Sequence, residues 1–151
     1  MYFLFDTNIL LYYIREDTNA TFIDSNYNPF GNRNTPILSV VSVGEIKSIA
    51  LRHKWGKKRS NRLKELMSLF VISDINTDDV INCYAEIDAF SQNKLDNKPL
   101  GITARNMGKN DIWIAATAYV TGSKLITSDN DFTHLENHYL EILKIPSLFS
   151  S

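Results

Sequence analysis

Four carboxylates stand beside short apolar segments that lie far apart in the chain: Asp6, Glu45, Asp111 and Asp129. Taken singly, Asp6 and Asp111 fit helix N-caps, and Asp129 fits a turn. Glu45 lies within the apolar segment 40–46, where an unpaired buried carboxylate is costly. If the four side chains converge, they raise one another's pKa values, and a divalent cation relieves the repulsion.

These acids predict a site for a hard cation. Carboxylate oxygens without thiolates favour Mg²⁺ or Mn²⁺, and the single cysteine, Cys83, lies in an apolar helical pattern typical of a buried side chain. One or two such ions polarise a phosphate and activate water, which is the chemistry of phosphodiester hydrolysis. His134 and His138 are four residues apart, but the sequence offers no third strong zinc ligand near them.

Apolar runs and capping residues predict an alternation of strands and helices. The expected strands are residues 2–5, 36–40, 70–72, 124–127 and 140–145. The expected helices are residues 9–14, 42–51, 57–70, 77–94 and 111–120. This alternation predicts a three-layer α/β/α sandwich around a central, mostly parallel sheet of about five strands. Ligands of such sheets bind beyond the carboxyl ends of the strands, so Asp6, Glu45 and Asp129 should meet at one edge.

Two long polar segments separate the expected elements. Residues 17–35 are rich in Asn, Asp, Thr, Pro and Gly, which predicts a surface loop inserted into the domain, with at most a short turn of helix. Residues 96–110 predict a second polar loop. Both segments are longer than most connections in compact domains, which indicates a role in binding or mobility.

Length and composition restrict the class of protein. The 151 residues are 44% hydrophobic, with a formal net charge of −1. These values predict one globular domain, residues 1–151, and exclude a polycation that coats nucleic acid. No apolar run reaches the length of a membrane span, and residues 1–5 lack the basic region of a signal peptide. We therefore expect a cytoplasmic protein with no membrane partner.

The four acidic segments resemble the motifs of PIN-domain nucleases. Asp-Thr-Asn at residues 6–8, after an apolar strand, resembles the first motif, and residues 39–46, which include the glutamate, resemble the second. Residues 111–118, an aspartate that leads an Ile-Ala-Ala helix, resemble the third, and residues 125–132 resemble the fourth. Because the four follow the family's order, the resemblance covers essentially the whole chain. The size resembles that of VapC toxins of toxin–antitoxin pairs.

The resemblance implies a PIN-like fold and a Mg²⁺- or Mn²⁺-dependent endoribonuclease that uses metal-activated water. It implies a toxin that cleaves tRNA or rRNA, binds a small antitoxin protein and forms a homodimer. The catalytic and metal-binding residues would be the acidic quartet Asp6, Glu45, Asp111 and Asp129. The supporting polar residues would be Asn8, Thr127, Asp131 and Ser39, with Asp131 as a rival or helper of Asp129.

A run of positive charge follows the second motif. Residues 47–64 contain eight Lys or Arg residues and no acid. A solvated helix face and a surface for RNA phosphates explain this run about equally well. The candidates for contact with RNA are Arg52, Lys54, Lys57, Lys58, Arg59, Arg105 and Lys109. Trp55 stands among these cations and fits packing first and base stacking second.

Other classes of function compete with a nuclease. A non-catalytic PIN-like module would bind RNA or a protein without cutting, although we expect such a module to lose acids. An aspartyl phosphatase would need a second aspartate at position 8, where the chain has Asn8. A phosphate-accepting receiver domain would need paired early acids and an aspartate after its third strand, which residues 71–74 supply poorly.

Overall fold

Five parallel strands form the centre of the computed structural model, which describes residues 1–146. The strands are β1 (Tyr2–Phe5), β2 (Thr35–Ser39), β3 (Val71–Ser73), β4 (Lys124–Thr127) and β5 (Glu141–Lys144). Their order across the sheet is β3-β2-β1-β4-β5, and every neighbouring pair is parallel. Because β1 lies between β2 and β4, the carboxyl ends of these three strands are adjacent. The expected parallel sheet is therefore confirmed.

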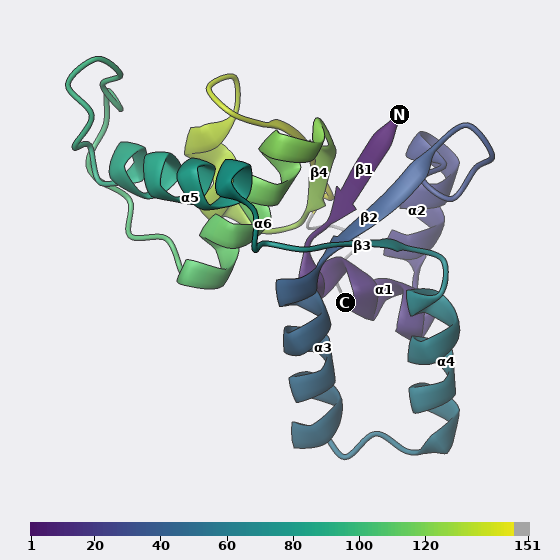
Figure 1. The fold of residues 1–151 in the computed structure, drawn as a ribbon. Helices are drawn as coiled ribbons and strands as arrows, with labels where there is room; N and C mark the ends of the chain where they lie inside the picture. The colour runs from purple at the N-terminus through teal and green to yellow at the C-terminus, as the bar shows by residue number, and fades with distance from the viewer. Residues whose placement is uncertain (147–151) are drawn as a thin grey trace.

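Helices connect the strands and cover the sheet (Figure 1). They are α1 (Thr7–Arg15), α2 (Thr18–Tyr27), α3 (Val40–Arg52), α4 (Lys57–Met67), α5 (Asp78–Ser91), α6 (Lys109–Thr121) and the 3₁₀ helix η1 (Asn130–Leu135). In Figure 1, α3 and α4 form a hairpin that projects from the sheet, while α5 and α6 lie together on the other side. No helix in residues 1–146 is long and apolar enough to cross a membrane.

The three central strands β1, β2 and β4 are largely buried on both faces, which explains their mainly apolar sequences. Phe3 and Phe5 pack on one face with α1, α2, α3 and α4. Leu4, which lies between them in β1, packs on the opposite face with α5, α6 and η1. Alternate side chains of one strand thus enter two separate clusters, as a two-sided sheet requires. This arrangement confirms the three-layer α/β/α prediction.

The prediction of a loop over residues 17–35 is wrong for its first half, which forms the ten-residue helix α2. The Asp17 side chain caps this helix by accepting a hydrogen bond from the Asn19 backbone N–H. Ala20 and Ile23 are buried, and α2 packs against α1. A narrow apolar stripe with tertiary contacts is enough to offset the low helix propensity of the many Asn and Thr residues. Asn28 ends α2 in the left-handed conformation, at φ 47°.

Two helices have boundaries that differ from the predicted ones by a few residues. The helix after β2 begins at Val40 rather than at residue 42, because the Ser39 side chain accepts the Val41 backbone N–H at 3.1 Å. The helix expected over 77–94 ends at Ser91. Residues 92–108 contain no helix or strand, as expected for the second polar loop.

Candidate active site

Asp6 lies at the centre of the edge where the strands end. It follows β1, and its backbone N–H donates to the Ile126 carbonyl of β4 at 3.0 Å. The carboxylate is only 4% exposed. Its Oδ1 accepts the Thr7 backbone N–H at 2.8 Å, and its Oδ2 accepts the Thr127 hydroxyl at 2.7 Å. Burial raises the pKa of Asp6 to about 6; these two hydrogen bonds oppose the rise, and nearby carboxylates add to it.

Glu45 approaches the same edge from the second turn of α3. The Thr7 hydroxyl lies 2.7 Å from Glu45 Oε1 and 2.8 Å from the Ser42 hydroxyl. Thr7 thus contacts Asp6 through its backbone and Glu45 through its side chain. The sequence analysis did not single out Thr7 or Ser42. The spacing of these two residues could have indicated them, since Thr7 follows Asp6 directly and Ser42 lies one helical turn before Glu45.

Three further carboxylates form a compact cluster. Asp111 lies in the first turn of α6, Asp129 caps η1, and Asp131 lies in its first turn. One oxygen from each lies within 4.8 Å of the others. Asp129 Oδ1 accepts the Asp131 backbone N–H at 2.9 Å, and the Asp129 backbone N–H donates to the Thr127 hydroxyl at 3.0 Å. Asp131 therefore lies beside Asp129 in the same cluster.

The five acids affect one another electrostatically. Burial first, and then the charges of Asp6, Asp129, Asp131 and Glu45, raise the pKa of Asp111 to about 7. The ion pairs found in residues 1–146, Arg62–Glu16 and Lys124–Glu141, include none of these five acids.

The donor set fits a hard divalent cation. Every side chain in the cluster offers oxygen, and Cys83, whose thiol has a pKa raised by burial, is a buried residue of α5 that packs in the apolar core. Oxygen ligands of this kind suit Mg²⁺ or Mn²⁺. The cluster found in the described residues contains three aspartates and no histidine. A bound cation would offset the repulsion that raises the Asp111 pKa.

Two of the supporting residues that the sequence suggested have other positions. Ser39 caps α3 and contacts the Val41 backbone rather than a carboxylate. Asn8 is exposed and lines a separate pocket of about 280 Å³ with Tyr12 and Ser128. Thr127 and Asp131, in contrast, lie among the acids.

Three basic candidates share a groove or a helix turn with one of the carboxylates. Arg52 lines a groove of about 520 Å³ that also includes Glu45. Arg105 lines a second groove of about 300 Å³ that includes Asp131. Lys109 is the exposed first residue of α6, two positions before Asp111.

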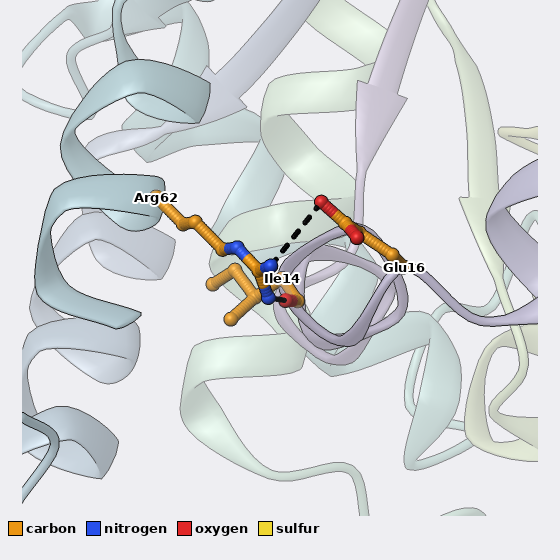
Figure 2. A network of polar contacts seen from close by, with 3 residues as sticks. All are labelled: Ile14, Glu16 and Arg62. Atoms are coloured by element: carbon orange, nitrogen blue, oxygen red, sulfur yellow. Dashed lines mark hydrogen bonds and ion pairs between the residues drawn. The ribbon is translucent and has the colours of Figure 1, made fainter. Parts of the chain in front are cut away.

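The remaining basic candidates form the tip of the α3–α4 hairpin. They are the exposed residues Lys54, Lys57, Lys58 and Arg59. The Arg59 guanidinium lies over the Trp55 ring at 5.5 Å from its centroid, and Trp55 packs against the apolar cluster. Arg62 has a structural role (Figure 2): it donates to the Ile14 carbonyl at 3.2 Å and pairs with Glu16 at 3.5 Å. This contact joins α4 to the end of α1.

The histidine pair does not form a metal site. His134 Nε2 lies 2.7 Å from the Ser91 hydroxyl, and the His138 ring packs against Phe90 with ring centroids 5.0 Å apart. Burial lowers the pKa of His134, with a further contribution from the charge of Arg105.

Comparisons with known proteins agree with this fold. A family model described as PIN domain matches residues 3–137. Comparison with curated proteins gives no match. The structure of FitAcB from Neisseria gonorrhoeae has a TM-score of 0.71 at 22% identity, covering 95% of this chain and 97% of that chain. VapBC-1 from nontypeable Haemophilus influenzae gives 0.71 at 19%, covering 95% and 98%. A toxin–antitoxin complex from Klebsiella pneumoniae gives 0.67 at 21%, also covering 95% and 98%.

Proposed function

Because the chain belongs to the PIN domain family, we propose that it is a Mg²⁺- or Mn²⁺-dependent endoribonuclease. The observation that carries this proposal is the convergence of five carboxylates at one sheet edge, none of them in an ion pair of the described residues. Such a cluster destabilises the folded chain, because the acids repel one another. A cation site used in catalysis accounts for that cost.

Asp111, Asp129 and Asp131 would hold the cation, with Asp6 completing the site from the end of β1. When bound, a divalent ion would polarise the scissile phosphate and lower the pKa of the water that it holds. Thr127 contacts both Asp6 and the backbone of Asp129, so it fixes two parts of the site relative to each other.

Glu45 is the proposed acceptor of the proton from the attacking water, or a ligand of a second ion. The Thr7 hydroxyl, 2.7 Å away, holds one Glu45 oxygen and leaves the other for this role. Arg52 lies in a groove with Glu45, Arg105 lies in a groove with Asp131, and both would hold RNA phosphates. In-line attack by water would leave 5′-phosphate and 3′-hydroxyl ends.

We further propose that the protein is the toxin of a toxin–antitoxin pair that acts on tRNA or rRNA. The support is structural similarity over nearly the full chain to proteins solved as VapBC or toxin–antitoxin complexes. A small antitoxin protein would block the site, and the chain would form a homodimer.

The alternative is a PIN-like module that binds RNA or a protein without cutting. The presence of all five acids favours catalysis over this alternative. The test is incubation of purified protein with total tRNA and rRNA in Mg²⁺, Mn²⁺ or EDTA, beside an Asp6→Asn variant. Discrete cuts that require metal and vanish in the variant support the nuclease. RNA binding without cutting under all conditions supports the binding module.

A further inference from the structure

Gly44 stands in the interior of α3, where the folded chain gives no reason for a glycine. It is exposed, and a Cβ built on it would meet no atom within 4 Å outside its immediate helix. The glycines with positive φ are Gly101 and Gly122, so Gly44 does not need left-handed freedom. Glycine weakens a helix interior relative to alanine. Glycine is used inside a helix where another molecule approaches the backbone closely, because glycine has no side chain to block the approach.

The space beside Gly44 is the groove of about 520 Å³ between α3 and α6, two helices that are in contact. This volume lies in the range of about 300–1,000 Å³ that small-ligand sites occupy. Glu45 lines the groove next to the acidic cluster, and Asn110 lines it from the first turn of α6, beside Asp111. Arg52 also lines it, two turns and about 10 Å farther along α3.

The lining has the chemistry of a nucleotide site. Val41 and Ile49 provide apolar surface for the face of a base. The Asn110 amide offers one acceptor and two donors for a base edge. Arg52, whose Nε donates to Ser48 at 3.3 Å, places a guanidinium where a neighbouring phosphate would lie.

We propose that this groove binds the nucleotide next to the cleaved phosphate of the RNA, and that Gly44 allows the nucleotide to lie directly against α3. The inference rests on the proposed function, because it takes the carboxylates beside Glu45 as the site of cleavage. A second copy of this chain is the weaker occupant, since Glu45 and Arg52 put charge in the groove, and charged residues are depleted in the cores of protein interfaces.

The test compares variants in an Asp111→Asn background, which prevents cleavage during a binding measurement. Fluorescein-labelled unfractionated tRNA is titrated in Mg²⁺ and followed by fluorescence anisotropy. Gly44→Leu places a bulky side chain in the groove and should weaken tRNA binding by about tenfold or more. A loss of this size is typical when a base loses the surface on which it stacks. Gly44→Ala adds one methyl and should weaken it by less than about threefold. Asn110→Ala, a variant that leaves α3 unchanged, should weaken it by about fivefold.

The matched control is Thr21→Leu, which places an exposed leucine on α2, away from the groove, and should bind tRNA like its parent. Thermal melting checks the fold: both Gly44 variants should melt no lower than the parent, because leucine and alanine favour helix more than glycine does. Light scattering gives the mass of each variant in solution.

Three results would overturn the inference. The first is a parent protein that does not bind tRNA, and the second is a Gly44→Leu variant that binds as tightly as its parent. The third is a Gly44→Leu variant with altered oligomeric mass and unaltered RNA binding, which would assign the groove to a second copy. Failure of the nuclease proposal looks different: the chain without the Asp111 change cuts no RNA, while Gly44→Leu still weakens binding.

Discussion

Replacement of Asp111 by asparagine should stabilise the metal-free protein at neutral and alkaline pH. Asp111 has its pKa raised to about 7, by burial first and by the surrounding acids second. Its folded-state pKa is higher than its unfolded value of 3.8, so the folded chain binds more protons than the unfolded chain between about pH 4 and pH 7. The free energy of unfolding therefore falls as pH rises through this window. Below it, the carboxyl is protonated in both states and contributes nothing.

The size of the effect follows from the two pKa values. At about 1.4 kcal/mol per pKa unit, the difference between the folded and unfolded pKa values corresponds to about 4 kcal/mol before solvent screening is taken into account. Asp111 is only half-buried, and solvent screening reduces this to about 2 kcal/mol. For a chain of this length, about 2 kcal/mol corresponds to about 4–8 °C in melting temperature. The Asp111→Asn variant should exceed the wild type by this amount at pH 8 and match it near pH 4.

The assay is urea unfolding in EDTA at several pH values, followed by the fluorescence of Trp55 and Trp113. The control is Asp96→Asn, because Asp96 is exposed in the loop before α6. Added Mn²⁺ should reverse the order of stability, since a ligand at 100 times its Kd stabilises the wild type by about 2.7 kcal/mol. A variant less stable than the wild type at pH 8 in EDTA would refute the reasoning, because Asp111 would then be held by favourable contacts.

Four further variants, at three positions, separate the roles of side chains near the site. Thr7→Val should lower the cleavage rate by about 10–100-fold and Thr7→Ser should restore most of it, measured as initial rates, because only the hydroxyl holds Glu45. Ser39→Ala should lower the free energy of unfolding by about 1 kcal/mol through loss of a helix cap; equal tRNA cleavage by this variant would confirm that Ser39 is structural. Arg62→Ala should cost about 1 kcal/mol or less, because Arg62 is bonded to Ile14 at a partly exposed site, and it should leave tRNA affinity unchanged in an anisotropy titration.

The sheet could be predicted because its central strands are largely buried on both faces. Residues 2–5 are a continuous apolar run, residues 125–126 are an apolar pair, and such short segments between helical patterns predict parallel strands. The meeting of Asp6 with residues at the end of β4 then followed from topology alone, since β1 and β4 pair directly.

Helix α2 could not be predicted because its signal is tertiary. Its sequence gives almost no amphipathic pattern, and only Ala20 and Ile23 supply a buried apolar stripe. The contact with α1, which no local sequence window contains, fixes the segment as helix.

Within the site, the sequence predicted which residues carry negative charge, but it did not predict their hydrogen-bond partners. The carboxylates were visible because acids beside apolar segments are rare. The sequence indicated Asp131 as a rival or helper of Asp129 but gave no sign of the role of Thr7. In the structure, the first turn of η1 brings Asp131 beside Asp129, and the turn after β1 aims the Thr7 hydroxyl at Glu45. The directions of these side chains depend on the folded backbone, so they could not be predicted from the sequence alone.

The central claim is that the carboxylates at the sheet edge hold a divalent ion that cleaves RNA. The most direct measurement is the end chemistry of tRNA and rRNA cut by the purified protein in Mn²⁺, in EDTA, and with Asp111→Asn beside Asp96→Asn. We expect cuts in Mn²⁺ that carry 5′-phosphate and 3′-hydroxyl ends, that disappear in EDTA and in Asp111→Asn, and that persist in Asp96→Asn. Cuts that survive EDTA, or that end in 2′,3′-cyclic phosphates, would contradict the central claim.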